Sequence, residues 1–399
     1  MATSSELPIS YVPNFEEYQL RAKRRQAEED LPTSLPEGFP AQLHSPLVWE
    51  GNDFSDPSSW TYSLSSPEID EITSALRHFQ SLKLPLGCIT PATFPLPNLR
   101  PTLRDLSRTI HSGRGFFVLR GLPVDQYAQD ETVIVYAGIS SYIGSLRGRQ
   151  DSKHNGQRAD VVLSHVVDLN NVAGRPAIGS PAFTADPQGF HTDTGDIVGL
   201  LMIGTGAAGG KSCIASTWKI YNELASSRPD LVRTLASDWA IDGFKRSSTP
   251  YYLRPLLYHH PATDTTPERV SLQFSRRSFT GYAAYKRSDY MPPVSEAQAE
   301  ALDALHFTAM KHQLTMQLEK GDIQFINNVA LVHAREGFRD EPENRRHLLR
   351  LWLRDEEFGW EVPAPLKGVW EGVFGGMSGK EEGQVFPAAP VVRGAQYGL

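Results

Sequence analysis

The sequence predicts a mainly β protein with flanking helices. Short apolar runs bounded by glycine, proline or polar residues recur along the chain and are typical of strands. Segments with apolar residues at helical spacing lie between some of these runs, but strands and helices do not alternate regularly. This pattern disfavours a doubly wound nucleotide-binding fold and favours a mostly antiparallel sheet structure. A double-sheet jelly roll is a fold of this kind.

Helix signals mark several segments. A Ser-Pro step followed by acidic residues opens 66–82, and a Ser-x-x-Gln start opens 295–322, which closes on a Gly-Asp turn. The Arg228-Pro229 step divides 217–237 into two short helices. The expected helical segments are 15–30, 66–82, 131–144, 217–237 and 295–322. The expected strands are 113–123, 159–169, 196–206, 213–217, 270–279, 323–336 and 344–355.

Three parts of the chain differ in composition. Residues 1–85 form an N-terminal arm with helices that packs on the core or leads into it, and residues 86–377 form the jelly-roll domain. The last part, 378–399, is rich in glycine, alanine and proline and is expected to be a poorly ordered tail.

Net charge, hydrophobicity and cysteine content indicate which kinds of binding partner and which cellular location to expect. The 399 residues carry a net charge of −7, which argues against a nucleic-acid partner. No apolar run approaches the roughly 18 residues of a membrane span, so no membrane partner is expected. With two cysteines and no apolar signal core at the N-terminus, a cytoplasmic location is the expectation. The oligomeric state is left open.

The stretch GFHTDTGD raises the possibility of a metal site. In an extended segment, residues two apart point to the same face, so His191 and Asp193 project together. An imidazole beside a carboxylate supplies two of the three ligands of the 2-His-1-carboxylate triad that holds non-haem Fe(II). A third ligand could be His333, which ends the apolar run in GDIQFINNVALVHARE. The alternatives are a simple His–Asp hydrogen bond and a strand-end histidine with ordinary partners.

The stretch RRHLLRLWLRD predicts a second polar feature. Strand alternation places Arg346, Leu348, Arg350 and Trp352 on one face, and His347 with the other leucines on the face that packs under helices. Buried guanidiniums require anionic partners, and a small-molecule carboxylate suits the bidentate fork of arginine. The alternative is an edge strand whose arginines are solvated.

The stretch GTGAAGGKS at 204–212 resembles a phosphate-binding loop but misses its spacing, because Thr205 stands where a glycine is required. Other polar residues that could face a site are Asn327, Asn328, Arg276 and Arg277. The polar segment 147–160 is either a substrate lid or an ordinary solvated loop.

Taken together and in their order, GFHTDTGD, GGKSCIAS, GDIQFINNVALVHARE and RRHLLRLWLRD resemble one enzyme family. They are similar to the taurine dioxygenase and clavaminate synthase-like branch of the Fe(II)- and 2-oxoglutarate-dependent dioxygenases, and the resemblance covers roughly residues 113–355. The resemblance implies a double-stranded β-helix fold with flanking helices.

The resemblance also implies site residues. His191, Asp193 and His333 would bind Fe(II) and form the catalytic centre. Arg346, with Arg345 as the nearby alternative, would grip the distal carboxylate of 2-oxoglutarate, and Ser212 would share it where relatives often have threonine. Arg350 would meet an acidic group of the substrate or co-substrate.

The reaction implied is hydroxylation of an unactivated C–H bond with O2, yielding succinate and CO2 from 2-oxoglutarate. The substrate expected is a small acidic or amino-acid-like metabolite that carries a carboxylate. Desaturation or ring closure at the same iron is an alternative outcome. A P-loop enzyme and a non-catalytic jelly-roll binding protein are alternatives of other classes.

Overall fold

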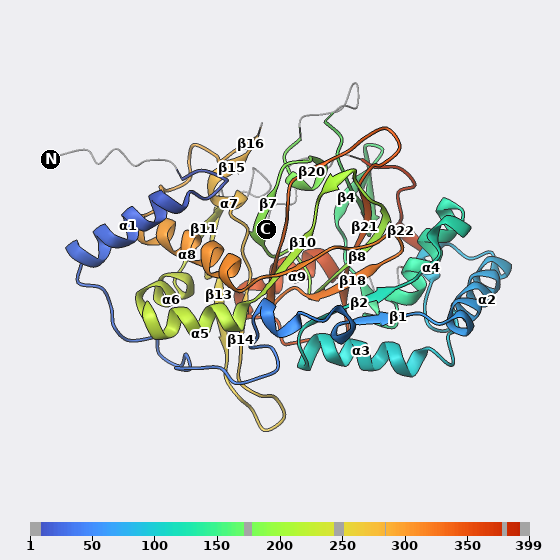
Figure 1. Cartoon of the computed structure of the whole chain (residues 1–399), viewed down its shortest axis with the longest axis horizontal. Helices are drawn as coiled ribbons and strands as arrows, with labels where there is room; N and C mark the ends of the chain where they lie inside the picture. Colours follow the sequence, from blue (N-terminus) through green and yellow to red (C-terminus); the bar gives the residue numbers. More distant parts are fainter. Residues whose placement is uncertain (1–8, 171–177, 243–250, 284, 377–380, 392–399) are drawn as a thin grey trace.

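The computed structural model describes residues 9–170, 178–242, 251–283, 285–376 and 381–391 (Figure 1). Its centre is a pair of sheets. The main sheet has the order β1-β2-β18-β8-β21-β3, with β6 also paired to β21. Its strands are β1 (Thr61–Ser63), β2 (Phe116–Arg120), β18 (Ile323–Asn327), β8 (Ile197–Gly204), β21 (His347–Arg354), β3 (Leu146–Arg147) and β6 (Leu163–Val167).

The second sheet has the order β17-β10-β19-β7, and all of its pairs are antiparallel. Its strands are β17 (Leu314–Met316), β10 (Ser212–Ser216), β19 (Leu331–Arg335) and β7 (Gln188–His191). Residues of the main sheet, such as Phe116 and Leu348, share a buried cluster with Ile214 and Leu331 of the second sheet. The two sheets therefore face each other across a common core, which confirms the predicted jelly roll.

Helices cover the outer faces of both sheets, as Figure 1 shows. Helices α2 (Ser66–Leu82), α3 (Arg100–Ser112) and α4 (Gln129–Ser140) pack on the main sheet, where Leu349, Leu351 and Leu353 of β21 are buried beneath them. Helices α5 (Thr217–Ser227), α6 (Pro229–Ala236) and α8 (Glu296–His312) cover the second sheet. The face predicted to pack under helices therefore does so, and the opposite face of β21 points into the jelly roll.

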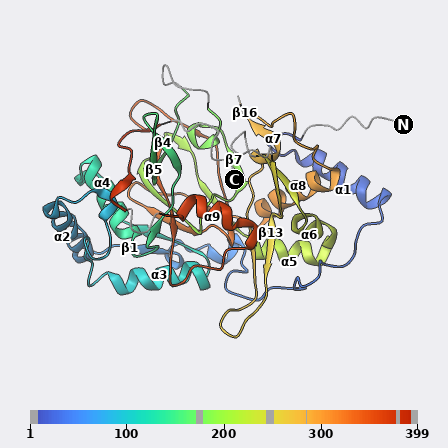
Figure 2. The ribbon, with the colours of Figure 1, turned by 180° about the vertical axis from the view of Figure 1, so that it is seen from behind.

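Helix α9 (Lys367–Phe374) closes one side of the jelly roll and is drawn in red in Figure 2. Trp370 and Phe374 of this helix share a buried cluster with Val198 of β8 and Trp352 of β21. The indole of Trp370 donates a hydrogen bond of 2.7 Å to Asp196. This packing fixes the position of Trp352, which reaches the site described below.

The remaining strands form small sheets outside the jelly roll. The pairs are β4 (Asp151–His154) with β5 (Gln157–Val161), β9 (Ala208–Gly209) with β20 (Phe338–Arg339), β11 (Trp239–Asp242) with β12 (Tyr251–Arg254), β13 (Leu257–His260) with β14 (Arg269–Leu272), β15 (Gly281–Tyr282) with β16 (Tyr285–Lys286), and β22 (Gln384–Val385) with β5. Among the helices that the structure describes, none is both long enough and apolar enough to cross a membrane.

The segment 323–336 differs from its prediction as a single strand. It forms β18 in the main sheet and β19 in the second sheet. The side-chain oxygen of Asn327 accepts hydrogen bonds from the backbone of Val329 and Ala330, which reverses the chain between the two strands. The apolar run hid this turn, because both strands are buried.

Two other expected strands are interrupted. The segment 159–169 divides into β5 and β6 at Val162, whose N–H donates to Val385 instead of continuing one ladder. The segment 270–279 ends as a strand at Leu272 and continues into the short helix α7 (Arg277–Thr280). The interruption places the two arginines of that segment beside the site.

The C-terminal segment is attached to the core, in contrast to the tail expected at 378–399. Strand β22 pairs in parallel with β5, and the carbonyl of Pro387 contacts Nε2 of His165 at 2.8 Å. Gln384 accepts a hydrogen bond of 2.8 Å from the buried Arg147. These bonds fix 381–391; residues 378–380 and 392–399 lie outside the described residues, and the domain limits remain a prediction.

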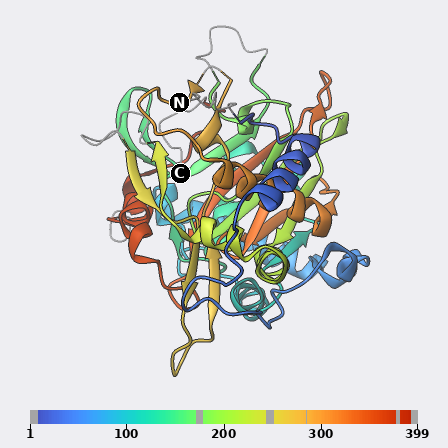
Figure 3. The same cartoon turned by 90° about the vertical axis from the view of Figure 1, so that its left-hand side faces the viewer.

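The N-terminal arm docks through helix α1 (Phe15–Glu28), which lies across α8 in Figure 3 (blue on orange). Arg21 of α1 pairs with Asp303 of α8 at 2.6 Å, and Asp303 also pairs with Arg276 at 2.8 Å. The Asp303 side chain is only 3% exposed. A buried carboxylate between two guanidiniums ties the arm to the core.

We expect Asp303→Asn to lower the free energy of unfolding by roughly 3–5 kcal/mol, because it removes the buried carboxylate that two buried arginines share. Urea unfolding measures this loss. The matched control is Glu296→Gln, which also removes a partner of Arg21 but at a carboxylate that is 49% exposed. The control should change stability by about 1 kcal/mol or less, and equal effects of the two variants would contradict this account.

Candidate metal centre

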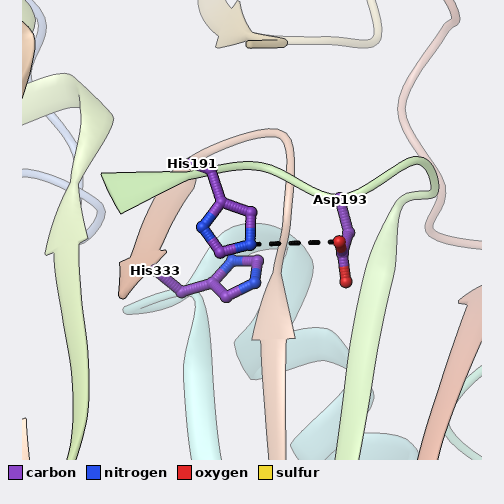
Figure 4. A group of neighbouring side chains, drawn as sticks. All are labelled: His191, Asp193 and His333. Atoms are coloured by element: carbon purple, nitrogen blue, oxygen red, sulfur yellow. Dashed lines mark ion pairs between the residues drawn. The ribbon is translucent and has the colours of Figure 1, made fainter. Parts of the chain in front are cut away.

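Three predicted ligands meet at the edge of the second sheet. His191 is the last residue of β7 and is paired in register with His333 of β19. Asp193 follows two residues later, and its Oδ1 lies 4.0 Å from Nε2 of His191. One ligand atom from each of the three residues can be chosen so that all lie within 4.8 Å of one another (Figure 4). All three residues are buried, with 8–9% of each residue's surface exposed.

The backbone of the His-x-Asp segment is held from both sides. The Asn328 side chain accepts from the N–H of Asp193 at 2.8 Å and donates to its carbonyl at 2.7 Å. Gln273 donates to the same carbonyl at 2.7 Å and accepts from the Thr192 hydroxyl at 2.6 Å. These bonds fix the orientation of Asp193 before any ligand binds.

The carboxylate of Asp193 is oriented by two donors. Arg350 donates to Oδ2 at 2.7 Å, and the indole of Trp352 donates to the same oxygen at 3.0 Å. Oδ1 is left facing His191. Burial is the largest single influence and disfavours the charged carboxylate, but Arg350, reinforced by the two histidines and by the Trp352 hydrogen bond, outweighs it and holds the pKa of Asp193 at about 2. Asp193 is therefore an anion at neutral pH.

The two histidines are neutral and have nitrogens suited to a cation. Nδ1 of His191 lies 2.9 Å from the carbonyl of Gly189, so this nitrogen carries the proton and Nε2 is a lone-pair donor. Burial lowers the pKa of both histidines, that of His333 to about 3. The buried Nδ1 of His333 has no partner among the described residues. Two neutral imidazoles and one carboxylate fit a divalent metal.

A cavity opens beside these residues. Its lining includes His191, Asp193, Arg350 and Trp352 from the jelly roll. Arg276 and Arg277 of the interrupted strand, together with Tyr11 of the N-terminal arm, complete part of the wall. Among the described lining residues, three are arginines and one is a carboxylate. The cavity is thus suited to a small molecule that carries negative charge.

A second polar cluster lies beside the three predicted ligands and includes Ser212 of β10, the strand that pairs with β19. Arg346 is 5% exposed and packs against the Gly209–Gly210 turn, where its Nε donates to the carbonyl of Gly210 at 3.2 Å. A Cβ at Gly210 would lie 2.8 Å from the Arg346 side chain, so glycine permits this approach. Ser212, two residues on, donates to Gln324 at 2.9 Å. The segment 204–212, which resembles a phosphate-binding loop, therefore brings a serine close to a buried arginine.

Arg335 belongs to the same cluster and was missed in the sequence. It is paired in register with Ser212, and its Nε and one terminal nitrogen are buried without partners among the described residues. Burial lowers the pKa of Arg335 to about 10, and burial together with the Arg335 charge lowers that of Arg346 to about 9. Two poorly neutralised guanidiniums, with the unfilled donors of Arg335, make this region suited to an anion. Arg335 lies two residues after His333 on β19, and strand alternation could have predicted that both side chains point to the same face.

Arg350 is placed differently from the expectation. Besides Asp193, it donates to Gln150 at 3.1 Å, so one of its partners is a carboxylate of the protein itself. It still lines the cavity, and its contact with a substrate or co-substrate stays a prediction. Gln150 lies in the segment 147–160, part of which forms the paired strands β4 and β5. The Gln150 side chain is completely buried. Arg346, which precedes β21, is buried, and the side chain of Arg350 in β21 is only 13% exposed, so the solvated-edge alternative is wrong.

Comparison with known proteins identifies the family. The model of the taurine catabolism dioxygenase TauD, TfdA family matches residues 80–352. The chain belongs to this family. It is 33% identical to the taurine hydroxylase-like protein SAT17 of Stachybotrys chartarum over 87% of this chain and 89% of that protein. It is 24% identical to the FR-33289 synthase of Streptomyces rubellomurinus over 80% of this chain and 92% of that protein.

Solved structures share the fold. An asparagine oxygenase in complex with Fe(II), hydroxyasparagine and succinate superposes with a TM-score of 0.55 at 18% identity, covering 75% of this chain and 98% of that one. The non-haem iron oxygenase OrfP in complex with Fe and α-ketoglutaric acid gives a TM-score of 0.53 at 14% identity, covering 74% and 94%. This TauD-family member is a 2-oxoglutarate-dependent non-haem iron dioxygenase, and its cofactors are Fe(II) and 2-oxoglutarate. The P-loop and non-catalytic alternatives are thereby wrong.

Proposed function

We propose that His191, Asp193 and His333 bind the Fe(II) of this TauD-family oxygenase. The observation that carries the proposal is the convergence of their ligand atoms within 4.8 Å in a buried site. Asp193 is held as an anion by Arg350 and Trp352, and both histidines are neutral, so each ligand has the protonation state that metal binding needs. Held by these residues, Fe(II) with 2-oxoglutarate would supply the oxidising chemistry, in which one oxygen atom of O2 goes into succinate, CO2 is released, and the other oxygen atom goes to the substrate.

We further propose that Arg346 and Ser212 hold the distal carboxylate of 2-oxoglutarate. The support is the burial of Arg346 beside Arg335, whose unfilled donors make this region cationic. The Ser212 hydroxyl can rotate from Gln324 toward a bound carboxylate, because a hydroxyl is both donor and acceptor. A bidentate guanidinium then fixes the co-substrate by its far end and leaves its other end for the metal.

The substrate that the cavity supports is a small acidic or amino-acid-like molecule with an anionic group. The arginines among its lining residues outnumber the single carboxylate, Asp193, and that carboxylate is committed to the metal. The chain's role is to orient a C–H bond of this molecule toward the metal and to exclude water from the site.

The test of this function is succinate release under O2 across a panel of amino acids and short carboxylic acids. We expect release that requires both Fe(II) and 2-oxoglutarate and is stimulated by at least one anionic compound, with one oxygen atom added to that compound. Stimulation by neutral analogues alone would contradict the substrate class.

The donors to Asp193 give a quantitative prediction. Trp352→Phe removes one hydrogen bond to Oδ2 and should weaken Fe(II) binding about 10-fold, as loss of an outer-shell partner does. Anaerobic Fe(II) titration of the purified variant measures this change. Trp370→Phe is the matched control, because Trp370 packs in the same cluster but donates to Asp196. Equal weakening in both variants would show that packing, and not the bond to Asp193, is responsible.

A further inference from the structure

The N-terminal arm reaches the catalytic cavity, although the family match begins only at residue 80. Tyr11 and Pro13 lie in its wall together with His191 and Asp193. The carbonyl of Ser10 accepts a hydrogen bond of 2.8 Å from Arg276, which is itself a wall residue. The arm is therefore part of the site and not only a support for the core.

The position of Tyr11 is fixed on several sides. Its ring packs edge-on against Tyr282 with centroids 4.8 Å apart, and Tyr282 is held by hydrogen bonds to Thr184 at 3.0 Å and Asp186 at 2.8 Å. Helix α1, which follows Tyr11, is tied to α8 by the Arg21–Asp303 ion pair. A side chain anchored in this way can select a ligand by geometry.

The phenol of Tyr11 is a permanent proton donor beside cations. Burial, reinforced by Tyr282, raises the pKa of Tyr11 well above its ordinary value, although the charges of Arg277 and Arg335 oppose this shift. The hydroxyl thus stays protonated at neutral pH and lies near two guanidiniums. A neutral donor among cations favours an anionic ligand.

Arg277 brings positive charge to the same wall. It opens helix α7, and its guanidinium donates to the carbonyl of Gly179. It lines the same cavity as Tyr11, Asp193 and Arg350, and its charge acts on all three. Arg350 is engaged by Asp193 at 2.7 Å and Arg276 by Asp303 at 2.8 Å. Arg277, like these two cavity arginines, has partners within the protein, the Gly179 carbonyl among them.

We propose that Tyr11 and Arg277 form the subsite for the anionic group of the substrate, with the N-terminal arm supplying its specificity-determining phenol. This inference rests on the proposed function. A guanidinium and a phenol can both donate to a carboxylate or to a sulfonate, so the shared chemistry is a small organic anion. The reacting carbon would then be directed toward His191 and Asp193, on the same wall of the cavity.

The test uses the full-length protein loaded anaerobically with Fe(II) and 2-oxoglutarate. Perturbation of the visible charge-transfer band reports ligand binding near the metal. The probes are β-alanine, taurine, the proteinogenic amino acids and short dicarboxylic acids, with the amide of each carboxylate as its neutral counterpart. β-Alanine and taurine distinguish a carboxylate from a sulfonate on the same carbon skeleton.

We expect at least one anion to perturb the band and its neutral counterpart to bind far more weakly. For that anion, Arg277→Gln should raise Kd about 10- to 100-fold and Tyr11→Phe about 3- to 10-fold, as loss of hydrogen bonds to a charged group does. The 2-oxoglutarate concentration that half-saturates the band should stay unchanged in both variants. Tyr18→Phe is the matched control on the same arm, because Tyr18 stacks on Phe307 away from the cavity.

Three results would overturn the subsite: no perturbation by any anion, equal loss for an anion and its amide, or an effect of Tyr18→Phe equal to that of Tyr11→Phe. Absence of the band in the folded wild-type protein is a different result. It would contradict the proposed iron and 2-oxoglutarate site itself, so the two failures are distinguishable.

Discussion

Asp193→Ala is expected to abolish turnover and to remove high-affinity Fe(II) binding. The variant deletes the anionic ligand between two neutral imidazoles, and it leaves the buried Arg350 guanidinium without its carboxylate. Positive charge beside the empty ligand position then opposes binding of a cation. The measurements are anaerobic Fe(II) titration and succinate release.

The control for this variant is Asp196→Asn. Asp196 is a buried carboxylate three residues away that pairs with Arg354 and accepts from Trp370, outside the three-ligand group. Its loss should lower thermal stability but leave Fe(II) binding intact. Full Fe(II) affinity and activity in Asp193→Ala, measured on folded protein, would refute the ligand assignment.

Arg346→Ala is expected to raise the 2-oxoglutarate requirement by at least about 30-fold, the equivalent of 2 kcal/mol or more, because a buried carboxylate loses its charged partner. Fe(II) binding should be unchanged, since Arg346 makes no contact with the three metal-site residues among the described hydrogen bonds and ion pairs. Arg346→Lys should recover only part of the affinity, because an ammonium cannot make the bidentate fork.

Arg345→Ala is the matched control for Arg346. Arg345 is the adjacent guanidinium and the alternative that the sequence allowed, but it is exposed, whereas Arg346 is buried. It should leave the 2-oxoglutarate requirement unchanged. A larger effect at Arg345 than at Arg346 would reverse the assignment of the two arginines.

Strand alternation explains why much of the site could be predicted. The period of two places His191 with Asp193 and separates Arg346 and Arg350 from Leu349 and Leu351. The structure confirms both face assignments, because the two leucines lie under helices, Arg346 is buried and Arg350 lines the cavity. Such local patterns depend on backbone geometry alone, so they can be read from the sequence.

Residues that reach the site through the tertiary fold could not be predicted in this way. Gln273 and Gln150 are ordinary polar residues in the sequence and become site residues through bonds to the Asp193 carbonyl and to Arg350. Tyr11 lies 180 residues before His191 and reaches the cavity because α1 docks on α8. The turn at Asn327 was hidden because continuous apolar character does not distinguish one buried strand from two.

We propose that His191, Asp193 and His333 form one site that holds Fe(II) for chelation by 2-oxoglutarate. Anaerobic titration of the wild-type protein with Fe(II) and 2-oxoglutarate tests it most directly. We expect a weak visible charge-transfer band that requires both components, saturates at one of each per chain and is missing in Asp193→Ala. A folded wild-type protein that develops no band, or an Asp193→Ala variant that develops it fully, would refute this iron site.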